Sequence, residues 1–391
     1  MGRAYLDWNA TAPLRPQARA AFGSAAEVFG NASSVHAEGR AAKALIERAR
    51  EQVAALVGAE PRDIVFTSGA TEANMLALGP EIGLGASVGR YDVLLVSAIE
   101  HVSVRNGGRF PPHCVAEIPV SPLGTVDLRA LESQLVELSG TGKRALVSIM
   151  QANNETGVIQ PVRNAAEMIH AAGGALHVDA VQGAGRIPCR MGDLGADLLS
   201  ISSHKLGGPK GAGALAFAAA APRPSALVRG GGQEGGMRAG TESVPAIAGF
   251  GAAAAAASIE ALESEHRRVL QLRDRFEAEL KRISPDAIVL GAEADRLPNT
   301  TLFAVPGMKA ETAVIAFDLE GVAVSSGAAC SSGKVQVSQV VAAMGFGAAL
   351  TKSGIRVSLG YSTTETEVDQ CLDAWKKVYA TLHKGSQGMA A

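Results

Sequence analysis

The sequence has few cysteines and no long hydrophobic run, and each of these absences excludes a class of protein. Its four cysteines are far apart and show no C-x-x-C spacing, which argues against a zinc site and against a disulfide framework. We therefore expect no metal and a reducing compartment, the cytoplasm. The N-terminus, MGRAYLDWNA, contains no apolar run of signal-peptide length. The longest apolar stretch, residues 246–259, is broken by glycines and too short to span a bilayer.

The sequence also lacks a strong charge of either sign. A formal net charge of −2 at pH 7 gives no electrostatic footprint for nucleic acid or an anionic membrane, so we expect neither as a partner. Apolar residues make up 47% and charged residues 19%, as in an ordinary globular protein. At 391 residues the chain is long enough for a large domain and a smaller one.

The order of the apolar runs predicts an α/β fold. Short apolar runs alternate with helical patterns, which is typical of parallel β/α units. The helix expected at 161–174 has proline at its start and glycine at its end, both in favoured places. The segment 211–217 is interpreted as an added antiparallel strand. The other strands are expected at residues 63–69, 92–97, 144–150, 174–179 and 197–203.

The C-terminal third predicts a second domain. From residue 241 to residue 283 a helical pattern runs so long that we expect it to link two domains. The elements expected beyond it are strands at 299–305 and 354–360, and helices near 309–320 and 335–344. The prediction is a large α/β domain with a mainly parallel sheet at 15–255 and a smaller α+β domain made of 1–14 and 256–391.

Polar residues follow the carboxyl ends of the predicted strands. In a parallel sheet these ends meet at one edge, where functional groups gather. The turn Ser68-Gly69-Ala70-Thr71 opens a helix and can hold a phosphate with free backbone amides and a hydroxyl. The other strand ends are followed by Glu100-His101, Asn153-Asn154-Glu155, Asp179 with Gln182, and Ser203-His204-Lys205.

Each of these groups alone has an ordinary structural explanation, but together they indicate a pyridoxal phosphate enzyme. Such an enzyme needs a lysine for a Schiff base, a carboxylate for the pyridinium nitrogen, a phosphate site and a group that stacks on the ring. The competing interpretation, a nucleotide-binding dehydrogenase, requires G-x-G-x-x-G between a strand and a helix. The glycine runs GGPKGAG and RGGGQEGGMRAG do not lie in that context.

A series of motifs carries a resemblance to a known family. In order along the chain they are FTSGATEAN, IEH, NNETGVIQP, HVDAVQGAG, SISSHKLGGPKGAGAL, GGGQEGGMRAGTES and SSGAACSSG. They closely resemble the NifS/IscS-type (group I) cysteine desulfurases, which belong to the class V aminotransferase family of fold-type I pyridoxal phosphate enzymes. The resemblance implies an enzyme that uses pyridoxal 5′-phosphate (PLP) to remove sulfur from L-cysteine and release L-alanine.

The resemblance also implies a role for each matching residue of the cofactor site. Lys205 matches the lysine that binds PLP covalently and later moves a proton, and Asp179 matches the partner of the pyridine nitrogen. Gln182 matches a hydrogen-bond donor to the phenolic oxygen of the ring, and His101 the histidine that stacks on the ring. The other implied cofactor contacts are Ala70, Thr71, Asn154, Ser202 and His204.

Two further implications concern the substrate and a second copy of the chain. Asn154 and Arg356 match the groups that hold the substrate carboxylate, a role that suits the planar fork of arginine. Thr241 matches a threonine that reaches the phosphate in the neighbouring subunit, which implies a homodimer with shared sites.

Cys330, in SSGAACSSG, matches the catalytic nucleophile of the family. Its thiolate is expected to take the sulfur as a persulfide and to pass it to an acceptor, such as an iron–sulfur scaffold protein. The sequence departs from the family at Ala328, where serine is common, and at KVQVSQV, but neither change removes a catalytic group. The alternatives are a selenocysteine lyase, a class V enzyme that does not need Cys330, and a non-catalytic sulfur-assembly subunit.

Overall fold

The computed structural model describes residues 2–84, 87–257, 259–327 and 337–387, and its largest sheet has seven strands. Within this sheet β10 runs antiparallel to both neighbours, and every other pair is parallel. The predicted α/β class and the antiparallel strand at 211–217 are therefore confirmed. The strand order is β2 (Ile64–Thr67), β10 (Gly213–Phe217), β9 (Leu198–Ser202), β8 (Ala175–Asp179), β7 (Ala145–Met150), β5 (Val93–Ser97) and β6 (Val115–Ile118).

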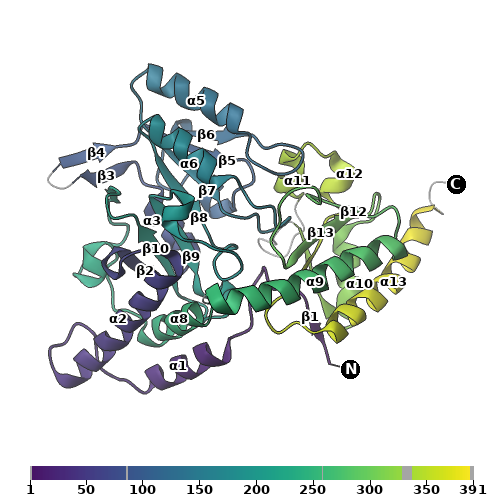
Figure 1. Ribbon diagram of the computed structural model, residues 1–391, viewed down its shortest axis with the longest axis horizontal. Coiled ribbons are helices and arrows are strands. Elements are labelled where there is room, and N and C mark those ends of the chain that lie inside the picture. Colours follow the sequence, from purple (N-terminus) through teal and green to yellow (C-terminus); the bar gives the residue numbers. More distant parts are fainter. Residues whose placement is uncertain (1, 85–86, 258, 328–336, 388–391) are drawn as a thin grey trace.

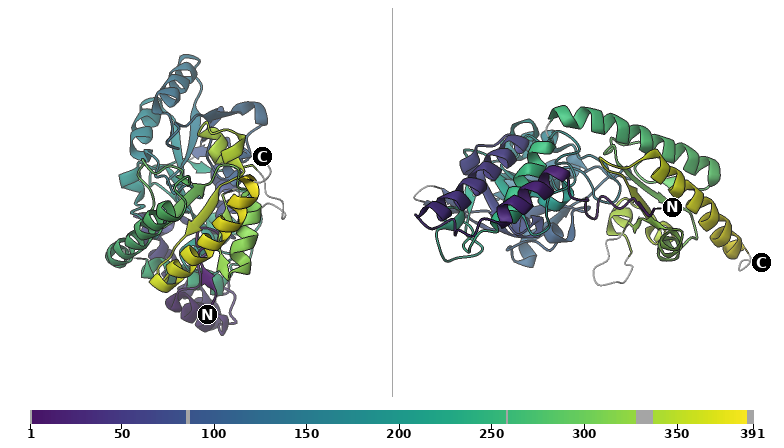
Figure 2. Two further views of the ribbon diagram at one scale, coloured as in Figure 1. Left: turned by 90° about the vertical axis from the view of Figure 1, so that its right-hand side faces the viewer. Right: turned by 90° about the horizontal axis from the view of Figure 1, so that it is seen from below.

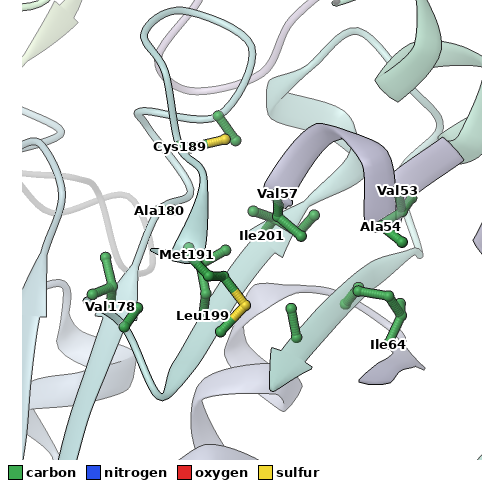
Figure 3. Packing of buried hydrophobic residues seen from close by; sticks show 14 of the residues in the cluster. Val53, Ala54, Val57, Ile64, Val178, Ala180, Cys189, Met191, Leu199 and Ile201 are labelled. Atoms are coloured by element: carbon green, nitrogen blue, oxygen red, sulfur yellow. The ribbon is translucent and has the colours of Figure 1, made fainter. Parts of the chain in front are cut away.

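Both faces of this sheet are buried. Successive side chains of each strand point to opposite faces, so each strand contributes to two hydrophobic clusters. In β2, Ile64 and Phe66 belong to one hydrophobic cluster and Val65 to another. Figure 3 shows part of the first cluster, where Val57 meets Ile201. The helices of the first face are α1 (Pro16–Ala26), α2 (Ala37–Val57), α5 (Leu128–Gly140), α6 (Val162–Ala171), α7 (Met191–Leu194) and α8 (Val244–Ala256), and those of the second are α3 (Ala70–Ala77) and α4 (Val102–Arg105).

The helical pattern over residues 241–283 forms two helices rather than one. α8 is apolar and packs against α1 and α2, whereas α9 (Ile259–Ile283) is rich in charged residues. α8 ends at Ala256, and the next residue, Ala257, has a φ of −95° and a ψ of 29°, outside the helical range. Figures 1 and 2 show α9 running along the long axis toward the C-terminal sheet.

The C-terminal third forms an antiparallel sheet of four strands with its own hydrophobic cluster. At the centre of that cluster Trp375 packs edge-on against Phe303, with ring centroids 5.0 Å apart. The strands are β12 (Ile288–Val289), β13 (Thr300–Ala304), β16 (Ile355–Ser358) and β15 (Ser325–Ser326), with helices α10 (Ala310–Leu319), α11 (Gln339–Ala343), α12 (Ala348–Thr351) and α13 (Glu365–Gln387). The strands expected at 299–305 and 354–360 and the helix at 309–320 are thus confirmed.

The N-terminus contacts this C-terminal sheet region rather than the large sheet. β1 (Ala4–Tyr5) pairs in parallel with β14 (Val322–Ala323), and Leu6 lies in the C-terminal hydrophobic cluster. The domain limits expected from the sequence stay a prediction. Strands that the sequence pattern did not predict are β6 and the edge sheet of β11 (Arg223–Pro224), β3 (Glu81–Leu84) and β4 (Ser87–Arg90).

Candidate active site

The carboxyl ends of the central strands border a cavity of about 830 Å³. Other parts of its wall are Ser325 of β15, Arg356 of β16 and N-terminal residues 7 and 9–11. All the residues that the sequence assigned to cofactor or substrate border it except Thr241. Those that border it are Ala70, Thr71, His101, Asn154, Asp179, Gln182, Ser202, His204, Lys205 and Arg356.

Lys205 lies in the cavity wall directly after β9, in a single helical turn. Its amine donates hydrogen bonds to the carbonyl oxygens of Asn9 and Ala10. Burial lowers the pKa of Lys205 to about 7, so a large part of the amine is neutral near neutral pH. Neutral amine is the form that attacks a carbonyl group. The charges that also act on it are Arg186 and Arg356, which lower its pKa, and Asp7 and Asp179, which raise it.

Asp179, at the end of β8, is held from behind by two hydrogen bonds. One oxygen accepts from the side-chain amide of Asn74 at 2.9 Å, and the other from the backbone N–H of Val181 at 3.0 Å. The same amide nitrogen of Asn74 donates to the hydroxyl of Ser103 at 3.0 Å. The carboxylate is thereby fixed in direction, with acceptor capacity left for a group in the cavity.

His101 caps the N-terminus of α4 and is oriented by Ser103. The backbone N–H of Ser103 donates to Nδ1 of His101, and the Ser103 hydroxyl lies 2.8 Å from the same atom. A backbone N–H can only donate, so Nδ1 is an acceptor and a neutral ring carries its proton on Nε2. Burial lowers the pKa of His101, with Lys205 adding to the effect and Asp179 opposing it. The ring is therefore neutral at neutral pH.

Arg356 is a buried residue, 3% exposed, in the wall of the cavity. One terminal nitrogen donates to the carbonyl oxygen of Asn154 at 3.0 Å, and the other forms an ion pair with Asp7 at 2.7 Å. Its Nε is buried and has no hydrogen-bond partner among the described residues. A buried, unpartnered donor of this kind suits an anionic acceptor such as a carboxylate.

The start of α3 offers a place for a phosphate. Amides in the first turn of a helix have no partner within the helix. A Cβ on Gly213 would come within 2.7 Å of Cα of Gly69 and 3.0 Å of the Ala70 nitrogen, so only glycine leaves this turn open. His204, whose Nδ1 lies 3.1 Å from the Thr11 hydroxyl, also borders the cavity. Burial, helped by Lys205, lowers its pKa to about 4, so it is neutral.

Two predicted site residues are absent from the described lining of this cavity, for different reasons. Cys330 lies outside the described residues; the described chain stops at Gly327, two residues after Ser325 in the cavity wall. Thr241 is exposed and does not border the cavity. Of the other cysteines, Cys189 and Cys371 are buried and burial raises the pKa of both thiols, that of Cys189 to about 12.

Several residues of the site were missed by reasoning from the sequence. Asp7 and Asn9 lie in the N-terminal stretch MGRAYLDWNA, where the sequence pattern predicted no strand end before them. Asn74 follows the predicted phosphate turn by one helical turn, a spacing that could have placed it near Asp179. Glu100 is buried, and burial together with the charge of Asp179 raises its pKa well above the usual range. The sequence did place Glu100 after a predicted strand, beside His101, but assigned it no role.

Glu155, in NNETG, is a second buried carboxyl group and borders both described ends of the Cys330 segment. The hydroxyl of Ser338 donates to it at 2.6 Å, and a Cβ on Gly327 would lie 2.9 Å from the same oxygen. Burial raises the pKa of Glu155 to about 7, although the hydrogen bond from Ser338 and the charge of Arg356 both lower it. Contact with Gly327 and Ser338 makes Glu155 part of the site's surroundings.

The described residues include neither a membrane-spanning helix nor a cluster of metal ligands. None of the helices within them combines the length and apolarity that crossing a membrane requires. They also contain no group of three or more histidine, cysteine or acidic side chains placed to hold a metal ion.

Comparison with known proteins identifies the family. The model of the family "Aminotransferase class-V" matches residues 4–371. The chain belongs to the class-V aminotransferase family. Among the relatives of this class-V chain is a cysteine desulfurase of Cereibacter sphaeroides, 41% identical over 379 residues and covering 95% of both chains. The cysteine desulfurase IscS of Dictyoglomus turgidum is 37% identical, covering 97% of this chain and 95% of its own.

The class-V assignment extends to the three-dimensional structure. The crystal structure of a NifS-like protein from Rickettsia africae superimposes with a TM-score of 0.85 at 35% identity, covering 97% of this chain and 99% of that one. The family and the fold predicted from the motifs are thus confirmed.

Proposed function

We propose that this protein is a PLP-dependent cysteine desulfurase, which converts L-cysteine to L-alanine and places the sulfur on Cys330. The observation that carries the proposal is Lys205. Its amine, with a pKa of about 7, borders the same cavity as the Asp179 carboxylate and the buried guanidinium of Arg356. Relatives that cover nearly the whole chain are named cysteine desulfurases, which supports the same function.

The cavity fits PLP in each of its parts. PLP, when bound, supplies an aldehyde for an amine and an electron sink for cleavage of bonds beside the substrate nitrogen. Lys205 would attach it, Asp179 would face its ring nitrogen, and Gln182 would donate to its phenolic oxygen. The residues that would hold its phosphate are Ala70, Thr71, Ser202 and His204, with Asn154 as a further contact.

The residues around the substrate divide binding from proton transfer. Arg356, with Asn154, would bind the substrate carboxylate, because its Nε is an unused buried donor. Lys205 can accept and return a proton near neutral pH, since its pKa lies in that range. His101 holds a proton on Nε2 and would stack on the ring, where it can act as an acid or a base.

The sulfur-transfer step belongs to Cys330. Its thiolate forms a new S–S bond with the substrate sulfur as the substrate C–S bond breaks. The electron pair of the C–S bond stays with carbon, which takes up a proton and becomes alanine, while Cys330 is left as a persulfide. An acceptor protein then takes this sulfur. We propose an iron–sulfur scaffold as that acceptor, in keeping with the IscS name of one relative.

We further propose that two copies share their sites through Thr241. The loop before Thr241 is held firmly: Glu234 accepts hydrogen bonds from Arg50 and from the Phe66 N–H, and Arg238 pairs with Glu72. A fixed loop that ends in an exposed threonine suits contact with another chain. Residues 29–35 also expose two large apolar side chains, Phe29 at 89% and Val35 at 88%.

The cofactor proposal is tested with two lysines of the same cavity. The purified protein should show the visible absorption of covalently bound PLP and should release alanine from L-cysteine. Lys205→Ala should lose both, while Lys210→Ala, which removes another lysine that borders the cavity, should keep the covalent absorption band. Covalent PLP found on Lys210 would refute the assignment.

The shared site is tested by mixing two inactive variants. Lys205→Ala and Thr241→Ala chains should regain part of the activity in mixed dimers, because one of the two sites then contains both native residues. No recovered activity after verified subunit exchange, with both parents inactive, would refute a shared site.

A further inference from the structure

Arg186 is a cation that lies behind the site without an acidic partner. It follows β8 in a tight turn, where its N–H donates to the Gly183 carbonyl at 2.9 Å. Its guanidinium donates to the Gln182 carbonyl at 2.9 Å, to the Gln182 side-chain oxygen, and to the Trp8 carbonyl at 3.3 Å. No ion pair among the described residues involves it. Burial lowers the pKa of Arg186 to about 10, and the repelling charge of Arg356 adds to this.

The turn that carries Arg186 has little freedom to move. A Cβ on Gly183 would lie 2.0 Å from the side-chain oxygen of Gln151, so this glycine is needed for the close packing. The amide of Gln151 in turn donates to the Pro188 carbonyl at 2.7 Å. The backbone before and after Arg186 is therefore closely packed against Gln151, which limits the movement of the turn that carries its guanidinium.

Arg186 determines which way the Gln182 amide points. A guanidinium has donors only, so the amide oxygen of Gln182 must face it. The amide nitrogen then faces the other way and donates to the Asn9 carbonyl at 3.1 Å, with its second hydrogen available to the cavity. Without Arg186 the amide could rotate and present its oxygen to the cavity instead.

The peptide carbonyls of Trp8 and Asn9 connect Arg186 to Lys205. The Asn9 carbonyl accepts from both Gln182 and Lys205, and the adjacent Trp8 carbonyl accepts from Arg186. Both cations thus lie against consecutive peptide groups, and both border a small recess of about 50 Å³. No acid in the described part of the chain pairs with Arg186, so its charge acts on Lys205.

We propose that Arg186 is a positioning residue of the proposed cofactor site, which fixes the donor orientation of Gln182 and places an uncompensated positive charge behind the Lys205 amine. This inference rests on the proposed function of the site. After burial, Arg186 is the largest influence that lowers the pKa of Lys205. Because the pKa values of His101 and His204 are lowered, these rings add no positive charge near neutral pH. The remaining charges on Lys205 are Arg356, Asp7 and Asp179.

The test measures the Lys205 amine in the cofactor-free protein. Acetic anhydride labels neutral amines, and mass spectrometry of the peptides gives the labelling rate of each lysine as a function of pH. Arg186→Met keeps the length of the side chain without its charge. It should raise the pKa of Lys205 by about one unit and lower its labelling near pH 7 several-fold, with Lys210 as the unchanged reference. Arg186→Lys should leave the Lys205 profile close to wild type.

A second variant keeps the proposal testable if Arg186→Met does not fold. Gln182→Glu supplies Arg186 with the missing acid and should also raise the pKa of Lys205. An unchanged Lys205 profile in the folded variants, or a rise in Arg186→Lys as large as in Arg186→Met, would overturn the charge effect.

Failure of this inference is distinguishable from failure of the proposed function. If the wild-type protein does not release alanine from L-cysteine while Lys205 still responds to Arg186, the proposed function is wrong and the charge effect stands. The donor orientation of Gln182 has its own readout, the affinity for PLP. It should fall several-fold in Arg186→Lys, which keeps the charge but not the fork, and an unchanged affinity would overturn this half of the proposal.

Discussion

Two arginines border the Lys205 region, and their surroundings differ. Arg356 is paired with Asp7 at 2.7 Å, and one of its nitrogens has no partner among the described residues. The guanidinium of Arg186 donates to oxygens of Gln182 and Trp8, and no acid among the described residues forms an ion pair with it. Arg356 is compensated by Asp7 and its Nε has no partner among the described residues, whereas Arg186 bonds through its two terminal nitrogens to neutral oxygens and keeps its charge.

The difference shows how one cavity can separate binding from tuning. A compensated guanidinium with an open donor can bind a carboxylate without leaving a large unbalanced charge in the empty site. An uncompensated guanidinium with engaged donors is poorly suited to bind a ligand, but its field acts on any nearby titratable group. We therefore assign substrate binding to the Arg356 side of the cavity and control of Lys205 to the Arg186 side.

The largest expected effect comes from Arg356→Leu. Loss of the carboxylate contact should lower kcat/KM for L-cysteine by about 100- to 1,000-fold, because a buried charged hydrogen bond is lost. Cysteamine, which has the amine and thiol of cysteine but no carboxylate, provides the matched ligand. Its binding should be nearly equal in the wild-type and variant proteins. A variant that still prefers cysteine to cysteamine as strongly as wild type would show that Arg356 does not bind the carboxylate.

A smaller effect is expected at Glu155, a buried acid on the Arg356 side. The folded protein keeps its proton up to about pH 7, whereas an unfolded glutamate loses it near its ordinary pKa of 4.5. The unfolded state therefore binds fewer protons in this window, and stability falls as pH rises through it. Relative to Glu155→Gln, the wild-type protein should lose about 3 kcal/mol of unfolding free energy across the window.

Denaturant unfolding of both proteins between about pH 5 and about pH 8 measures this difference. Parallel pH profiles of the two proteins would show that the charge of Arg356, which lowers the pKa of Glu155, outweighs the burial that raises it. Such a result would break the comparison, because it would make Arg356 a strong field source like Arg186.

The smallest effect is expected from Asp7→Asn, which makes Arg356 resemble Arg186. Removal of the Asp7 charge takes away a contribution that raises the pKa of Lys205 and leaves Arg356 uncompensated. The pKa of Lys205 should fall below about 7, by up to about one unit. The labelling experiment used for Arg186 reads this directly, with Lys210 as reference. A rise in the pKa would contradict the proposed electrostatics.

The sequence predicted the large sheet well because its strands are continuous apolar runs buried on both faces. It also located Lys205 and Asp179, since each directly follows such a run. It did not predict β6, in which only Ile118 is fully buried and Glu117 is exposed. Asp7, Asn9 and Arg186 were missed for another reason: tertiary contacts bring Asp7 and Asn9 to the cavity and Arg186 to the small recess behind it, and local pattern contains no information on those contacts.

The central claim is that sulfur from L-cysteine is transferred to Cys330. The most direct measurement is mass spectrometry of peptides from the PLP-loaded protein after brief treatment with L-cysteine under non-reducing conditions. The account predicts one additional sulfur atom on the peptide containing Cys330, and in Cys330→Ala loss of that mass and of alanine release while PLP stays bound. Additional sulfur on Cys114, Cys189 or Cys371, or full activity in Cys330→Ala, would contradict it.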